Sequence, residues 1–292
     1  MILRQTKRFP TTIYEATSRS GIPKGGRELK RYLFVDAGCL QIVAKELGER
    51  FFENQPIPIE YSRLLGLNGP VEKLFYYDAF PSQERDEPIE KYEARTAEKR
   101  AFLDRLDTIN RFSVFHGDIK REGTSKQRQK KVDIAIAVDM LTNAHRKNME
   151  EAILLAGDLD FQPLLLALAQ DGMPVTLYYP WKASKELLRA ALIRRPLDLQ
   201  TVWPLATNDF LEQYPVPVFA PVSPLYSSGG RIVKSWLTRA GFAASLRQYE
   251  DEFAVHVQGG SGNPDLLAKS KSRAAILEFA RLQRPEYEVP KD

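Results

Sequence analysis

Residues 149–180 constrain the fold more than any other stretch, because they have the pattern of a strand, a turn, a helix and a second strand. Residues 151–156 form an apolar run of strand length, which Gly157 interrupts. A helix is predicted from about residue 161 to 171, and a second apolar strand over 173–179. Two strands joined through a helix form a right-handed unit of a parallel sheet.

Two carboxylates, Asp158 and Asp160, follow the first strand of this unit. Asp160 is a candidate N-cap of the helix, and Pro163 falls in the first helical turn, where a missing N–H does no harm. Open α/β sheets bind their ligands at the edge where parallel strands end. Two acids one residue apart at that edge indicate a metal site.

The rest of residues 29–204 alternates between strand and helix patterns, which predicts a parallel sheet covered on both faces. The further strands are predicted at 32–36, 73–79, 112–116 and 197–202. The further helices are predicted at 39–52, 86–110, 132–146 and 184–193, of which 132–146 is apolar on most sides and is therefore expected to be buried.

Four acids are predicted to meet at the carboxyl edge of this sheet: Asp36, Asp133, Asp158 and Asp160. Asp36 ends the first strand, and Asp133 is expected in the first turn of the helix that begins at about residue 132. Without histidine or cysteine, such a set suits Mg²⁺ or Mn²⁺, with room for two ions about 3.5–4 Å apart. Asp139 lies about 9 Å further along the helix and is left out as a direct ligand.

Taken alone, these acids also have other interpretations: Asp160 as an N-cap, Asp133 as a first-turn acid that favours the helix dipole, and Asp36 as a ribose ligand or simply the end of a strand. Their shared edge is what favours the metal site. Asp78 also falls near a strand end, but the sequence does not fix its direction. Cys39 has no identifiable catalytic partner, and the three histidines are scattered. Trp181, just past a strand end, is a candidate to stack on a base.

Composition limits the class of protein. The 292 residues are 43% hydrophobic, which is enough for a core, and the single cysteine excludes disulfides and thiolate zinc sites. The sequence contains no run of about 18 apolar residues and begins without an apolar signal core, so neither a membrane span nor export is expected. The expected location is the cytoplasm.

The net charge of +4 is unevenly distributed. Residues 1–28 form a basic N-terminal arm, and a second basic run lies in a predicted loop ahead of the 132–146 helix. Beside an acidic metal site, such runs favour contact with a phosphate backbone over a merely solvated surface. The predicted RNA-binding residues are Lys120, Arg121, Lys126, Arg128, Lys130 and Lys131.

Four blocks in the 29–204 region resemble the NYN domain, the PIN-like ribonuclease domain of the LabA-like group. They are YLFVDAGCL, FYYDAFP, KKVDIAIAVDML and AILLAGDLDFQPLLLALAQDGMPVTLYYP, in this order. The resemblance implies a PIN-like α/β/α sandwich with a central parallel sheet and metal-dependent cleavage of RNA. Its acidic positions map onto the same four aspartates. Three positions depart from the family pattern: Cys39 replaces an asparagine, Lys131 a glycine and Ala156 a serine.

Residues 205–228 are rich in proline and serine and are predicted to be a linker to a small α+β domain at 229–292. There we expect a helix at 231–240, a hairpin of 242–248 with 253–258, and a helix at 266–282. This order faintly resembles a double-stranded RNA-binding domain, in which Lys269, Lys271 and Arg273 would contact phosphates. The alternative is a module that binds a protein partner or a second copy of the chain.

The favoured hypothesis is therefore an endoribonuclease whose carboxylates hold Mg²⁺ or Mn²⁺. The main alternative is a catalytically silent module of the same fold that binds RNA or protein. A third hypothesis is a phosphatase or phosphotransfer enzyme with Asp36 as the nucleophile, but Gly38 occupies the place where a second aspartate is normally needed.

Overall fold

The computed structural model describes residues 29–291 except 82, 85–86, 117–124, 223–228 and 261–262, and of residues 125–130 it describes only the helical backbone. The predicted arm at 1–28, Lys120 and Arg121, and the side chains of Lys126, Arg128 and Lys130 lie outside this part. Of the predicted RNA-binding residues, Lys131 alone has a described side chain, and it is exposed.

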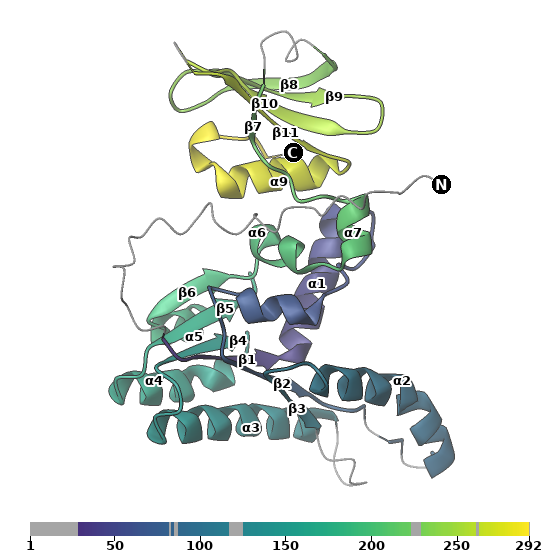
Figure 1. Ribbon diagram of the computed structural model, residues 1–292, viewed down its shortest axis with the longest axis vertical. Coiled ribbons are helices and arrows are strands. Elements are labelled where there is room, and N and C mark those ends of the chain that lie inside the picture. Colours follow the sequence, from purple (N-terminus) through teal and green to yellow (C-terminus); the bar gives the residue numbers. More distant parts are fainter. Residues whose placement is uncertain are drawn as a thin grey trace, which may run out of the picture.

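The larger unit is built on six parallel strands in the order β3-β2-β1-β4-β5-β6 (Figure 1). These strands are β1 (Arg31–Asp36), β2 (Lys73–Asp78), β3 (Phe112–His116), β4 (Glu151–Leu155), β5 (Val175–Tyr179) and β6 (Ile193–Pro196). The four inner strands are apolar and largely buried, as expected for a parallel sheet covered on both faces. The predicted α/β sandwich is confirmed.

Helices cover both faces of this sheet. The first face is covered by α1 (Ala37–Phe51), η1 (Tyr61–Gly66), α2 (Ile89–Asp107), α6 (Leu199–Val202) and η3 (Trp203–Leu205). The second face is covered by α3 (Ser125–His145), η2 (Leu159–Phe161), α4 (Gln162–Gln170) and α5 (Lys185–Ala190). Apolar side chains alternate between the two faces: Leu33 and Val35 of β1 pack on the first face, and Phe34 packs on the second.

Three elements of the larger unit differ from the sequence prediction. The helix predicted from 132 begins seven residues earlier, and it is not fully buried, because Ile134 and Val138 are 62% and 54% exposed. The strand predicted at 197–202 is wrong: β6 precedes it, and Asp198 caps the short helix α6 by accepting a hydrogen bond from the Thr201 N–H at 3.0 Å. A capping aspartate starts a helix wherever its neighbours can bury their apolar side, as Leu199 and Val202 do here.

The smaller unit is a five-stranded antiparallel sheet in the order β7-β11-β10-β9-β8, covered by one helix (Figure 1). Its elements are β7 (Ala220–Val222), β8 (Arg231–Leu237), β9 (Ala243–Gln248), β10 (Phe253–Val257), β11 (Asp265–Ser270), α9 (Arg273–Gln283) and η4 (Pro285–Tyr287). The predicted β9–β10 hairpin is confirmed. Between the two units, the predicted linker contains α7 (Asn208–Gln213) as well as β7.

Of the two helices predicted in the smaller unit, the one at 231–240 is wrong, and the one at 266–282 is present but begins later than predicted. Residues 231–237 form the strand β8, whose side chains alternate in burial along most of its length as it pairs with β9. Residues 265–270 form β11, and the last helix starts only after Ser272, whose hydroxyl caps it by accepting from the Ala275 N–H. The described part of this unit therefore lacks the first helix of a double-stranded RNA-binding domain. Lys269 lies on β11, paired with Glu252 at 3.2 Å, and not at a helix start.

Helix α9 joins the two units. Its Ile276 and Ala280 pack on the antiparallel sheet, whereas Ala275 and Phe279 belong to the core of the larger unit. Phe279 meets the fully buried Trp203 edge to face, with ring centroids 6.0 Å apart. The Ser272 hydroxyl also donates a hydrogen bond to the carbonyl of Phe51 at the end of α1. One core of the larger unit therefore includes side chains of α9, and the antiparallel sheet forms a separate core with the other side of this helix.

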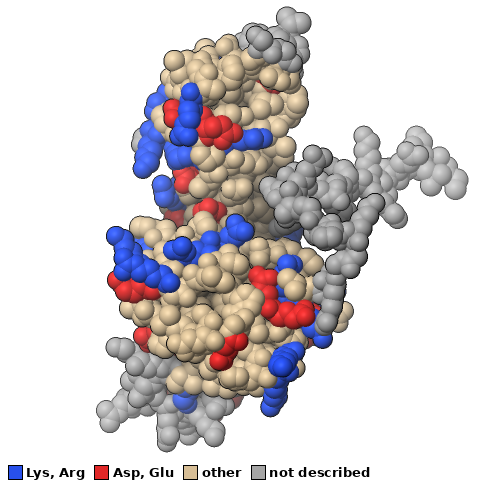
Figure 2. Space-filling model, turned by 90° about the vertical axis from the view of Figure 1, so that its left-hand side faces the viewer, with Lys and Arg blue, Asp and Glu red and all other residues tan. Residues whose placement is uncertain are grey.

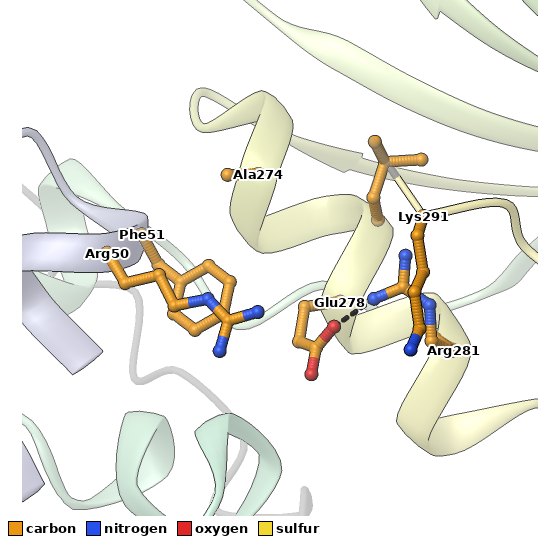
Figure 3. A pocket seen from close by; sticks show the side chains of 7 residues that line it. Arg50, Phe51, Ala274, Glu278, Arg281 and Lys291 are labelled. Carbon is orange, nitrogen blue, oxygen red and sulfur yellow. Dashed lines mark hydrogen bonds and ion pairs between the residues drawn. The ribbon is translucent and has the colours of Figure 1, made fainter. Parts of the chain in front are cut away.

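A pocket of about 410 Å³ lies at the seam between the end of α1 and α9 (Figure 3). Arg50 and Phe51 line it from α1, and the Glu278–Arg281 ion pair and Lys291 line it from the smaller unit. The pocket is at the end of α1 opposite to Asp36, so it is separate from the predicted acidic site. In the part of the chain that is described, no helix is long and apolar enough to cross a membrane.

Candidate functional site

Asp36 is the last residue of β1 and also the N-cap of α1. Its Oδ1 accepts a hydrogen bond from the Gly38 N–H at 3.0 Å, which fixes the carboxylate at the carboxyl edge of the sheet. Burial raises the pKa of Asp36 to about 6; backbone N–H groups of Cys39 and Gly38 oppose this rise, and the charges of Asp78 and Asp158 add to it. Asp36 thus lies within electrostatic reach of two other carboxylates.

Asp158 follows β4, the strand next to β1, and is the N-cap of η2. Its Oδ1 accepts from the Asp160 N–H at 3.0 Å. The sequence had suggested Asp160 as the capping residue of this segment. The capping residue is instead Asp158, because a 3₁₀ turn precedes α4. Asp160 is exposed within that turn. The prediction of α4, with Pro163 at its start, is confirmed.

Asp133 does not lie in the first turn of its helix, where it was predicted. It is the ninth residue of α3, about 12 Å along the axis from the start of the helix rather than in its first turn. Its side chain is half-buried. The sequence placed the helix start too late because it took the polar segment ahead of Val132 for a loop, whereas residues 125–131 are helical.

Asp139 is held by a tyrosine of the sheet. Its Oδ2 accepts a hydrogen bond from the Tyr77 hydroxyl at 2.7 Å, and burial together with Asp139 raises the pKa of Tyr77. Tyr77 is the register partner of Asp36 across β1 and β2. Asp139 therefore contacts Tyr77, which lies beside Asp36 in the sheet. That Asp139 is not a direct metal ligand stays a prediction.

Asp78 is the acid whose direction the sequence left open. It ends β2, is 7% exposed, and accepts a hydrogen bond from the Ala79 N–H at 2.8 Å. Lys99 of α2 pairs with its Oδ1 at 2.8 Å and also donates to the Ala79 carbonyl. A strand-end acid beside β1 was visible in the sequence. Its lysine partner, 21 residues away on another element, was not.

Gly157 permits the close packing of this edge. A Cβ built on Gly157 would lie 2.5 Å from Cγ of Pro180 and 3.7 Å from Sγ of Cys39. The segment before Asp158 therefore packs directly against the end of β5 and the start of α1. Cys39 is buried, and burial raises the pKa of its thiol, so it is unsuited to act as a nucleophile.

The donor set fits a hard divalent cation. In the part of the chain that the structure describes, no group of three or more histidine, cysteine, aspartate or glutamate side chains has the spacing of a metal site. Mg²⁺, however, is commonly bound through one or two carboxylates, with water and substrate phosphates completing its shell. Asp36 and Asp158 are two such carboxylates at the ends of neighbouring strands, and a cation would relieve the repulsion between their charges.

The comparisons with known proteins identify the class to which this arrangement belongs. A parallel six-stranded sheet with helices on both faces is a PIN-like fold. The sequence model of the NYN domain matches residues 32–194, more than half of the chain, and the chain therefore belongs to the NYN domain family. The predicted family is confirmed.

Other comparisons add little. Among solved structures, a protein of unknown function from Vibrio parahaemolyticus RIMD 2210633 is 19% identical, with a TM-score of 0.43, and the match covers 60% of this chain and 96% of that one. A search of curated proteins finds no match.

Proposed function

We propose that this protein is a metal-dependent endoribonuclease that hydrolyses RNA phosphodiester bonds at the carboxyl edge of its parallel sheet. The observation that carries the proposal is the pair Asp36 and Asp158, fixed by backbone hydrogen bonds at the ends of two neighbouring strands and close enough for the charge of Asp158 to raise the pKa of Asp36. The family supports it, because the NYN domain is PIN-like.

The chain's own residues would orient the reacting groups. Backbone N–H groups of Gly38 and Asp160 donate to one oxygen of each carboxylate and so fix the orientation of Asp36 and Asp158. Bound Mg²⁺ or Mn²⁺ would supply the nucleophile, by lowering the pKa of a water, and would offset charge on the phosphate. Lys99 compensates the charge of Asp78, so we assign Asp78 a positioning role.

The proposal keeps Asp133 and Asp160 as further acids of the site. Asp160 lies two residues beyond Asp158 and is exposed, which suits contact through water. Lys131, two residues before Asp133 on α3, is exposed and would contact the RNA backbone together with the other basic residues of 120–130.

The test is Mn²⁺-dependent cleavage of RNA by the purified full chain. Asp158→Asn keeps an oxygen to accept the Asp160 N–H but removes the charge, so cleavage is expected to fall at least about 100-fold, as for loss of a transition-state electrostatic contact. Asp104→Asn, an exposed acid on α2, is the matched control and should cleave as the wild type does.

Cleavage that Asp158→Asn leaves unchanged would refute the assigned chemistry. A wild-type chain that binds RNA but does not cleave it with Mn²⁺ or Mg²⁺ would favour the second candidate, a catalytically silent binding module. The presence of Lys99 at the acidic edge is the observation that favours this alternative, because a fixed ammonium group there competes with a cation for Asp78.

A further inference from the structure

Trp181 lies on the surface in a fixed orientation. Its side chain is 72% exposed, yet its indole N–H donates to Oε2 of Glu46 at 2.9 Å. The Lys182 ammonium lies 4.7 Å from the centre of the indole ring and donates to the other Glu46 oxygen at 2.7 Å. Because Glu46 satisfies both polar groups, the ring is held in place while most of its apolar surface stays open to solvent.

The backbone that carries this ring begins at the acidic edge. Trp181 follows Pro180, the residue against which Gly157 packs, and Asp158 follows Gly157. Glu46, which orients the ring, is the tenth residue of α1, about 15 Å along the helix axis from the cap Asp36. An RNA strand stacked on Trp181 would therefore have to continue past it to reach the site proposed above.

Positive charge lies next to Trp181, at the outer edge of the sheet. All four residues of the edge strand β6 are exposed, among them Arg194 and Arg195, and Lys185 and Arg189 of α5 are exposed as well. None of these four cations has an ion pair within the part of the chain that the structure describes. Figure 2 faces the side of the molecule that carries β6 and α5, and Lys and Arg side chains gather on it at the level of β6.

The two arginines of β6 point to opposite faces of the sheet. Arg195 is the register partner of Tyr178, which packs on the α1 face, and Arg194 is the partner of Leu177, which packs on the α4 face. Charged side chains on an edge strand also discourage pairing with other sheets. That role does not account for an oriented, exposed tryptophan beside them.

We propose that Trp181 and the cations of α5 and β6 form a binding track for single-stranded RNA that crosses the open edge of β6, with a base stacked on Trp181 and phosphates held by Arg195 on one face of the sheet and by Arg194 on the other. The inference rests on the proposed function for its choice of ligand, but it concerns binding and not cleavage. Stacking on an aromatic ring together with charge along the backbone is how proteins hold single strands without reading their sequence.

The test uses the full chain carrying Asp158→Asn, in EDTA, with a fluorescein-labelled 12-nucleotide single-stranded RNA followed by anisotropy. Adding Trp181→Ala should weaken binding about 5- to 150-fold, the range equivalent to about 1–3 kcal/mol for one stacked base. Trp181→Phe keeps an aromatic ring and should restore most of the affinity. RNA should quench tryptophan emission in the parent but much less in Trp181→Phe.

The arginines are tested by the salt dependence of binding. Arg194→Gln with Arg195→Gln should lower the slope of log K against log salt concentration by about 1.4, or about 0.7 for each lost phosphate contact. Arg105→Gln, which removes an exposed charge from α2 beside the other edge of the sheet, is the matched control and should leave the slope unchanged.

The proposal would be overturned if Trp181→Ala and the double arginine variant bound RNA within twofold of the affinity of the parent. It would also be overturned if the control Arg105→Gln weakened binding as much as they do, or if the parent did not bind RNA. Binding that depends on Trp181 in a wild-type chain that does not cleave RNA would support the track and refute the nuclease. If the wild-type chain cleaves RNA but Trp181→Ala binds it as tightly as the parent does, the nuclease would be supported and the track refuted.

Discussion

Replacing Asp36 by asparagine is expected to stabilise the metal-free protein at neutral pH. The pKa of Asp36 is raised from 3.8 to about 6, mainly by burial. A carboxyl group with a raised pKa in the folded state binds its proton more tightly there than in the unfolded chain. The Asp36 carboxyl group therefore makes its full favourable contribution to the free energy of folding below pH 3.8, and this contribution is lost as the pH rises through 6.

The size of this effect follows from the shift of about two pKa units, each equivalent to about 1.4 kcal/mol. Above pH 7 the ionised Asp36 costs at most about 3 kcal/mol, and about half of that at pH 5. The asparagine side chain is neutral at every pH, and the substitution Asp36→Asn keeps an oxygen to accept the Gly38 N–H, so the cap of α1 is preserved. The variant should melt roughly 4–10 °C higher than the wild type at pH 8.

Thermal unfolding followed by circular dichroism in EDTA, at pH 5 and pH 8, measures this difference. The melting temperature of Asp36→Asn should exceed that of the wild type by more at pH 8 than at pH 5. Added Mn²⁺ should then raise the melting temperature of the wild type but not that of Asp36→Asn. A variant that is less stable than the wild type at pH 8, or whose advantage does not grow with pH, would refute the reasoning.

Three further substitutions test the packing around the site by denaturant unfolding. Phe279→Ala should cost about 3–5 kcal/mol, because it opens a cavity in the core of the larger unit. Lys99→Met should cost about 1.5–3 kcal/mol by leaving the buried Asp78 without its charged partner, and Asp78→Asn in the same chain should restore most of the loss. Gly157→Ala should cost about 1–3 kcal/mol, since its methyl group would meet Pro180.

Each of these expectations can fail. A Phe279→Ala chain of near wild-type stability would show that α9 does not couple the two units. If Asp78→Asn does not restore the stability lost in Lys99→Met, the loss comes from packing and not from the unpaired charge of Asp78. A Gly157→Ala chain of unchanged stability would mean that Pro180 moves freely.

The parallel sheet could be predicted from the sequence because its strands are short apolar runs that end in glycine or aspartate, as at Asp36 and Gly157. The start of α3 could not, because its first residues are polar and basic and lie outside the apolar period that marks Val132 and Ile136. In the smaller unit, 231–237 was taken for a helix. It forms a strand because it pairs with β9. This pairing is a tertiary contact, which the local sequence pattern does not predict.

The same distinction applies to the candidate site. Asp36 and Asp158 could be placed at one edge of the sheet by topology alone. The ion pair of Lys99 with Asp78 and the bond of Glu46 to Trp181 join residues that are distant in the chain, and sequence spacing predicts neither. The position of Asp133 was wrong because it depended on a helix start that carries no clear cap.

The most direct test of the account is a crystal of the full chain soaked in MnCl₂ and measured at a wavelength where manganese scatters anomalously. The account predicts a manganese peak within coordination distance of the carboxylates of Asp36 and Asp158. Its absence at that edge in ordered crystals, or an Asp158→Asn crystal with the same peak, would contradict the central claim.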